Sequence, residues 1–94
     1  MRYEELKCDG KTFTNEAEIS RILKAKKFYW LIDSEIEHAK LEIKKETLIW
    51  HGGSFYSGNW PYGIFRSGSF HGTWKGGIFE NGNFDGTWID GIRL

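Results

Sequence analysis

The residues of this sequence that could do chemistry lie mostly in its second half. His51 and His71 each follow an aromatic residue, and Glu80, Asp85 and Asp90 recur at regular intervals. A histidine pair with Asp85 or Asp90 could hold a metal ion, and neighbouring carboxylates could act as a general acid and base. No apolar run surrounds them to raise the pKa of one carboxyl group. We therefore expect no enzyme activity, no metal site and no cofactor.

Cys8 is the only cysteine, so neither an internal disulfide nor a cysteine-based zinc site can form. We expect it to be a small buried side chain. Residues 1–5 lack the apolar run of a signal peptide, and no stretch reaches the roughly 20 apolar residues that span a bilayer. The length of 94 residues predicts a single domain, 1–94, and we expect it to be soluble and cytoplasmic.

Charge gives no sign of a polyanionic partner. The formal net charge is zero, from thirteen basic and thirteen acidic residues, and residues 1–48 and 49–94 are each balanced. A strong basic excess would favour a phosphate backbone or an anionic membrane. We therefore expect no nucleic-acid partner, although one face of the fold could still collect like charges.

Turn and capping signals predict the first elements. Asp9-Gly10 predicts a two-residue hairpin turn between strands at 3–8 and 11–13. Asn15 is a helix N-cap, with a glutamate three residues later. Apolar residues then recur at helical spacing, which predicts a helix at about 16–27.

The next segment is ambiguous. The apolar run 28–32 is typical of a buried strand. Ser34 could cap a second helix, but apolar residues alternate at 38–43, which favours a strand paired with another at 47–51 through a turn at 44–46.

From Trp50 onward the composition changes. Eleven of the twelve glycines and eleven of the sixteen aromatic residues lie between Trp50 and Leu94. The aromatics recur at steps of five residues, with four-residue steps from Phe70 to Trp74 and from Phe84 to Trp88. The last two units match at a period of 14, which defines an internal repeat. The recurring aromatics are Trp50, Phe55, Trp60, Phe65, Phe70, Trp74, Phe79, Phe84 and Trp88.

A glycine stands three residues after most of these aromatics, where it permits positive φ. Two-residue hairpin turns at these glycines would pair each aromatic with the next across antiparallel strands. We predict an α+β fold: a strand-helix-strand cap (1–48) followed by a glycine-punctuated antiparallel meander (49–94). The alternative is a small β-solenoid. In either case, we expect the repeat rings to be buried and the residues that follow them to be exposed: Arg66, His71, Lys75, Glu80 and Asp85.

Two repeat families share parts of this pattern. Phe70-His71-Gly72-Thr73-Trp74-Lys75-Gly76-Gly77 and its counterpart at 84–91 resemble the MORN core, aromatic-x-Gly-x-Trp-x-x-Gly, although the period of 14 is shorter. The five-residue steps resemble pentapeptide-repeat proteins, in which a small residue two before a central apolar one builds a right-handed β-solenoid, as in Gly82-Asn83-Phe84. The MORN resemblance implies a scaffold that binds proteins or lipid headgroups. The pentapeptide resemblance implies a DNA-imitating inhibitor, which needs more acidic residues than this neutral chain has.

The sequence thus predicts a non-catalytic protein-binding module, and a small phage-type inhibitor of a host defence enzyme is one form of it. A glycan- or lipid-headgroup-binding module that uses Tyr56, Tyr62 and the tryptophans is the alternative. An uncapped edge strand at 92–94 and an aromatic face wider than one short helix can cover favour a protein partner or a homodimer. The candidate binding residues are Tyr56, Tyr62, His51, His71, Glu80 and Asp85.

Overall fold

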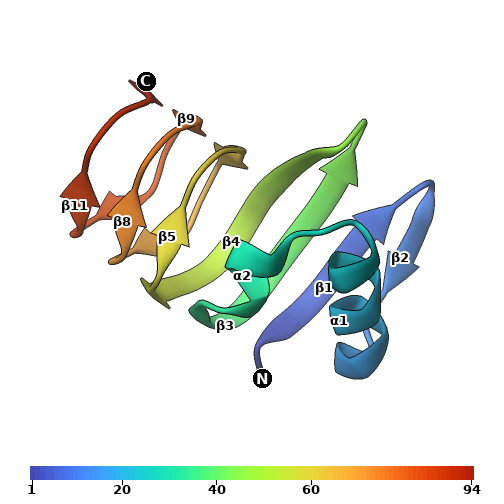
Figure 1. Ribbon diagram of the computed structural model, residues 1–94. Coiled ribbons are helices and arrows are strands. Elements are labelled where there is room, and N and C mark those ends of the chain that lie inside the picture. Colours follow the sequence, from blue (N-terminus) through green and yellow to red (C-terminus); the bar gives the residue numbers. More distant parts are fainter.

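The computed structural model describes residues 1–94 and is mostly β, with two short helices (Figure 1). We call residues 1–48 the cap and residues 49–94 the stack. The elements of the cap are β1 (Tyr3–Cys8), β2 (Lys11–Phe13), α1 (Glu16–Ala25), α2 (Tyr29–Ile32) and β3 (Glu35–Lys44). A long strand, β4 (Thr47–Ser57), leads from the cap into the stack. Eight two-residue strands follow: β5 (Asn59–Trp60), β6 (Ile64–Phe65), β7 (Ser69–Phe70), β8 (Thr73–Trp74), β9 (Ile78–Phe79), β10 (Asn83–Phe84), β11 (Thr87–Trp88) and β12 (Ile92–Arg93).

The first hairpin and the first helix form where the sequence predicts them. β1 and β2 are antiparallel, and Asp9 and Gly10 both have positive φ, 52° and 75°, as a tight hairpin turn requires. The side-chain oxygen of Asn15 accepts a hydrogen bond from the backbone N–H of Glu18 at 3.0 Å. This contact confirms the predicted N-cap. The helix ends at Ala25, slightly before the predicted end at 27.

The strand predicted at 28–32 is wrong, because these residues form the short helix α2. The Arg2 guanidinium donates hydrogen bonds to the carbonyl oxygens of Leu31 at 3.2 Å and Ile32 at 3.0 Å, and to that of Ser34 at 2.7 Å. These bonds supply a donor to carbonyl groups at the end of the helix, where backbone donors run out; the Leu31 carbonyl also accepts from the Ser34 N–H. A partner distant in sequence thus overrides the β-propensity of the apolar run.

β3 and β4 confirm the strands predicted at 38–43 and 47–51, and both extend further. They pair antiparallel from Lys44↔Thr47 outward, and β1 lies parallel to β3 on its other side. The alternating residues Ala39, Leu41 and Ile43 are all buried. The alternative helix capped by Ser34 does not form, and the Ser34 hydroxyl instead donates to the carbonyl of Trp30.

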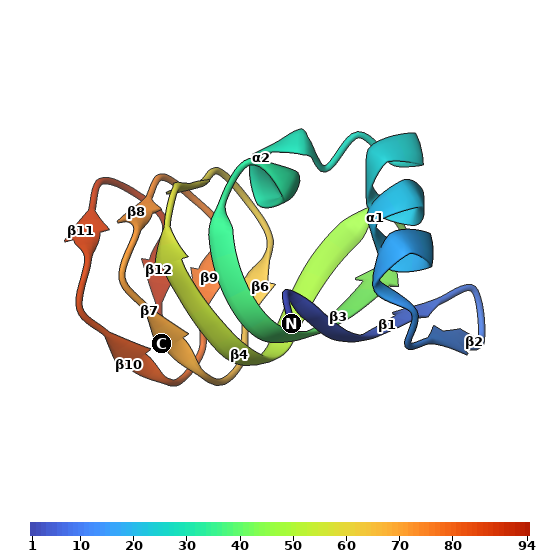
Figure 2. The same ribbon diagram turned by 90° about the horizontal axis from the view of Figure 1, so that it is seen from below.

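The predicted antiparallel meander is wrong, and the stack is the alternative: a small β-solenoid whose strands are parallel. Phe65 pairs in register with Phe79, one full coil later, and not with a neighbour five residues away. β4 contributes to two sides of the first coil, because it pairs with β6 near Trp50 and with β7 near Phe55. Figure 2 shows the successive coils side by side beyond β4.

The glycine signal that suggested hairpins marks the corners of these coils. Positive φ occurs at each predicted glycine of the stack, with values such as 114° at Gly68 and 118° at Gly91. Some corners also need glycine for space: a Cβ at Gly68 would run into the carbonyl oxygen of Gly53, one coil back. Hairpin turns and solenoid corners both require positive φ, so this signal alone does not distinguish them. The glycines of this set are Gly53, Gly58, Gly63, Gly68, Gly77, Gly82 and Gly91.

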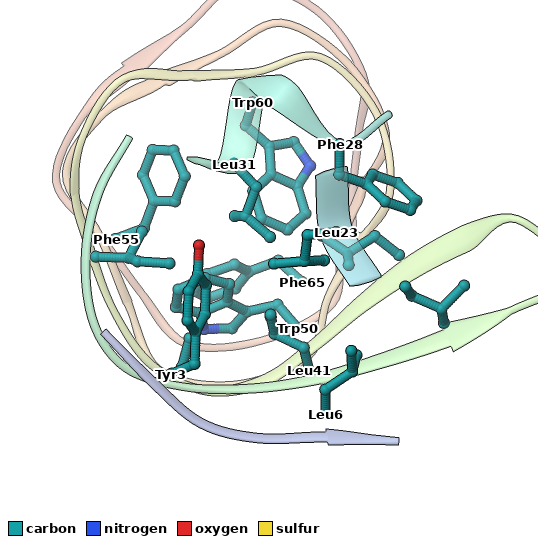
Figure 3. Packing of buried hydrophobic residues seen from close by; sticks show 14 of the residues in the cluster. Tyr3, Leu6, Leu23, Phe28, Leu31, Leu41, Trp50, Phe55, Trp60 and Phe65 are labelled. Atoms are coloured by element: carbon teal, nitrogen blue, oxygen red, sulfur yellow. The ribbon is translucent and has the colours of Figure 1, made fainter. Parts of the chain in front are cut away.

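Inside the coils, aromatic rings stack face to face in three columns, and like rings meet at every step except from Trp50 to Phe65. The ring centroids of Trp60 and Trp74 lie 5.0 Å apart, with an angle of 10° between the ring planes. Those of Phe65 and Phe79 lie 5.0 Å apart, at 8°. Figure 3 shows rings of the first coils pointing inward, next to cap residues such as Leu31. Stacking explains how an interior this narrow accommodates tryptophans. The three columns are Trp50–Phe65–Phe79, Phe55–Phe70–Phe84 and Trp60–Trp74–Trp88.

The expected burial of the rings holds except at the end of the chain. Phe65, Phe70 and Trp74 are fully buried and Phe79 nearly so, whereas Phe84 and Trp88 in the last coil are only half-buried. The residues that follow the rings are exposed as expected, with Glu80 half-buried. The buried core is therefore continuous from the cap through the inner coils and opens at the last one.

Candidate functional site

The residues that follow the inward rings form columns of their own on the outside of the stack. Backbone bonds set this alignment: the N–H of His71 donates to the carbonyl of Phe55 and that of Asp85 to Phe70, each at 2.8 Å. Side chains at equivalent positions of successive coils therefore lie above one another. Two outer columns contain most of the predicted binding residues: Tyr56–His71–Asp85 and His51–Arg66–Glu80.

The first outer column brings three predicted residues together. The rings of Tyr56 and His71 stack with centroids 6.1 Å apart and an interplanar angle of 17°. Nδ1 of His71 lies 3.8 Å from Oδ2 of Asp85, which is too far for a hydrogen bond. All three side chains are exposed. The column is an open polar row with no pocket around it.

The second outer column is held by its own contacts. Nε2 of His51 lies 2.8 Å from Oε1 of Glu42 on β3, and this hydrogen bond lowers the pKa of Glu42 below its ordinary value, with burial acting in the opposite direction. Nε of Arg66 lies 3.4 Å from Oε1 of Glu80. His51 and Glu80 are therefore engaged within the protein and do not join Tyr56.

Tyr62 lies apart from both columns. Its ring packs against Phe28, with centroids 6.2 Å apart, and against Trp30, at 5.6 Å, yet the residue remains 45% exposed. It borders a hollow lined by Lys26, Lys27 and Glu46. The six predicted binding residues thus fall in three separate places.

The three carboxylates considered for acid–base chemistry, those of Glu80, Asp85 and Asp90, each have a different neighbour, which for Asp85 is His71. Glu80 pairs with Arg66, and Asp90 accepts a hydrogen bond from the backbone N–H of Gly91 at 2.8 Å. No three His, Cys, Asp or Glu side chains gather into a group that could hold a metal ion. Burial raises the pKa of the Cys8 thiol, and the neighbouring Asp9 carboxylate adds to the effect. Cys8 is thus a poor nucleophile at neutral pH.

The last coil is the most unusual surface of the molecule, and we call it the open coil (residues 82–94). Its strands β10, β11 and β12 pair only with the preceding coil. The Arg93 guanidinium lies over Phe79 and Phe84, 5.5 Å and 5.2 Å from the ring centroids, and covers part of the end. The largest exposed apolar side chains of the coil are Ile89, Ile92 and Leu94, at 60%, 57% and 77%.

The sequence placed an uncapped strand at 92–94, but it did not single out these aliphatic residues. Repeat alignment is the signal that finds them. Ile89 takes the outward position of Lys75, and Leu94 that of Glu80, while Arg93 replaces the inward ring of Phe79. In the open coil, two of the three outward positions thus change from polar to apolar, and one inward position changes from an aromatic ring to a cation.

Comparison with models of protein families, with curated proteins and with solved structures gives no match. Neither helix has the length and apolar character needed to cross a membrane. We therefore infer function from the geometry of this chain.

Proposed function

We propose that the protein is a non-catalytic protein-binding module and that it binds a partner protein at the open coil. The observation that carries the proposal is an apolar coil end whose strands have a partner on one side only. Exposed strand edges accept further strands, and an exposed apolar patch indicates a contact surface. A small inhibitor of an enzyme, such as a phage-type inhibitor of a host defence enzyme, is one form that a binding module of this size would take.

The open coil has backbone carbonyl groups with which another strand can pair. In the inner coils, carbonyl groups accept from the next coil, as Phe70 does from Asp85 and Trp74 from Ile89. By the repeat, the equivalent carbonyls are those of Phe84 and Trp88, which face the open side. A partner strand that donates N–H groups there would continue the ladder by one more coil.

The side chains supply the complementary apolar contact. Phe84 and Trp88 end two ring columns and are half-buried, so a partner side chain placed on either ring would complete its burial. Large aromatic residues of this kind contribute strongly to protein interfaces. Ile92 and Leu94 extend the same apolar surface.

The test uses site-specific photocrosslinking. One variant carries a photoreactive residue at position 94, and a matched control variant carries it at position 17, where Ala17 of α1 is exposed to solvent. Each variant is irradiated in lysate of the encoding organism, and the captured proteins are identified and purified. We expect capture from position 94 only. We also expect Ile92→Asp to weaken binding of the purified partner at least tenfold, whereas the control variant Thr14→Asp, at an exposed residue that lines none of the hollows, should bind as the parent does. Equal affinity of the Ile92→Asp variant, capture from both positions, or crosslinks to a second copy alone would overturn the proposal; the last result would identify a homodimer.

The Tyr56–His71–Asp85 column supports a second candidate, a glycan or lipid headgroup. An exposed aromatic ring next to an exposed carboxylate can contact a sugar ring and its hydroxyl groups. Trp50, Trp60 and Trp74 are fully buried and are not available for this. Glycan-array binding that is lost in Tyr56→Ala and kept in Ile92→Asp would favour the second candidate.

A further inference from the structure

Most charges of the neutral cap are separated along one direction. β1 and β3 are parallel, and α1 runs the same way in Figure 1, from the end near the N-terminus to the end with the hairpin turns. Each of these elements begins with glutamates and ends with lysines or is followed by them. The glutamates are Glu4, Glu5, Glu16, Glu18, Glu35 and Glu37. The lysines, with Lys11 just after the first turn, are Lys7, Lys11, Lys26, Lys27, Lys44 and Lys45.

We call these six lysines the lysine edge, and they line a continuous series of hollows. One hollow of about 340 Å³ lies between the two hairpins and is lined by Lys7, Lys11, Lys44 and Lys45. Lys11 also lines a second hollow of about 460 Å³ together with Lys26. Lys26 in turn lines the hollow next to Tyr62, and Lys44 and Lys45 line one beside Arg66. Each hollow shares at least one lysine with the next.

The charge of the lysine edge is not neutralised within the protein. Seven basic side chains line these hollows, against three carboxylates, those of Asp9, Glu42 and Glu46. One of the seven, Arg66, is paired with Glu80 outside the hollows. Glu42 is already hydrogen-bonded to His51. All six lysines are exposed, and none forms an ion pair with a carboxylate. The edge therefore presents free positive charge.

We propose that the lysine edge binds an acidic segment of a protein that also carries apolar side chains. The hollow next to Lys11 and Lys26 has apolar walls that include Phe13 and Ile22, and the hollow beside Arg66 includes Ile49 and Ile64. An acidic peptide can insert apolar side chains into such hollows while its carboxylates meet the lysines. This surface is separate from the open coil and does not depend on the function proposed there.

A nucleic acid fits the lysine edge less well. Asp9 and Glu46 lie among the lysines, so an unbroken row of phosphates would meet repulsion at these points, whereas a peptide can space its carboxylates to avoid them. Six of the seven cations are lysines, which lack the planar fork of arginine for phosphate recognition.

The test measures fluorescence anisotropy of a labelled peptide built from the repeat Glu-Leu-Glu-Phe. The double variant Lys11→Glu/Lys45→Glu should bind it at least about tenfold more weakly than the parent, and binding should weaken as salt rises. Lys75→Glu, an exposed change on the stack, and Ile92→Asp, on the open coil, should leave it unchanged. A peptide with serine in place of leucine and phenylalanine should also bind more weakly.

Three outcomes would overturn this proposal. They are absence of peptide binding at low salt, equal affinity of the double variant, and tighter binding of duplex DNA than of the peptide at the same lysines. The last would identify a nucleic-acid surface. Because Ile92→Asp reports only on the open coil, failure of one proposed surface is distinguishable from failure of the other.

Discussion

The cap and the stack build one buried core by different means. In the cap, aliphatic side chains from unlike elements meet, such as Leu6 of β1, Leu23 of α1 and Leu41 of β3, all buried. In the stack, one coil is repeated and like rings lie face to face, as Trp60 and Trp74 do. Each coil contacts mainly its neighbours, so the stability of the stack is close to a sum of contributions from contacts between adjacent coils. The cap has no such modular arrangement, because β1, α1 and β3 pack on one another.

This comparison predicts that position within the stack decides the cost of losing a ring. We expect Trp74→Ala to lower the free energy of unfolding by about 3–5 kcal/mol, because Trp74 stacks against a tryptophan on each side. Trp88→Ala removes a half-buried ring with one such neighbour and should cost about 1–2 kcal/mol. Urea unfolding followed by circular dichroism measures both. Equal losses for the two variants would show that the coils are not stabilised by stacking on both sides.

A second prediction contrasts a corner of the stack with the hairpin turn of the cap. Gly68 and Gly10 both have positive φ, but a Cβ at Gly68 would meet backbone of the preceding coil, whereas none lies within 4 Å at Gly10. Gly68→Ala should therefore cost about 2–4 kcal/mol from strain and overpacking together. Gly10→Ala should cost only about 1 kcal/mol. Thermal melts that place both variants together would contradict the close approach of the coils.

Local signals of the sequence specify turns better than they specify what the chain does after a turn. Asp9-Gly10 and Asn15 act within a few residues, and both predictions hold. The glycines of the stack were also predicted to have positive φ, but the direction of the next strand depends on which residues pair across coils. The 14-residue period of the sequence repeat indicates this pairing, because parallel coils of that length bring like residues into register, as with Phe65 and Phe79.

Other features needed the three-dimensional arrangement. The helix α2 depends on Arg2, which is far from it in sequence. The lysine edge depends on three elements running in one direction, which a balanced composition does not show. Of the candidate binding residues, Tyr56, His71 and Asp85 come together because the repeat aligns them, whereas His51 turns to a partner on β3.

A third prediction concerns the hydrogen bond at the N-terminus of α1, which forms between residues close in sequence. Asn15→Ala removes the side-chain acceptor of the Glu18 N–H and should lower the free energy of unfolding by about 1 kcal/mol. Asn15→Asp keeps an acceptor and should retain most of the stability. If both variants lose the same amount of stability, the hydrogen bond of the Asn15 side chain contributes little to holding α1 in place.

The smallest expected effect lies at the junction, where Glu42 of β3 meets His51 of β4. The pKa of Glu42 is lower in the folded protein than its ordinary value of 4.5, mainly through this hydrogen bond. Folding therefore favours the ionised carboxylate, and the associated stability is present above pH 4.5 and is lost as the pH falls through the folded-state pKa. Glu42→Gln should thus be less stable than the parent at neutral pH, and the difference should shrink on acidification.

The pKa of Glu16 is also lowered, by a hydrogen bond from the Tyr3 N–H. Such other carboxylates titrate in the parent and in Glu42→Gln alike, so the difference in stability between the two proteins isolates the contribution of Glu42. Urea unfolding of both proteins across the acidic range measures it. His51→Gln should reduce the same pH-dependent difference, because the hydrogen bond from His51 is the main cause of the lowered pKa. A difference that stays constant with pH would mean that Glu42 supports the junction through packing alone, and that the cap and the stack are joined there without an electrostatic contribution.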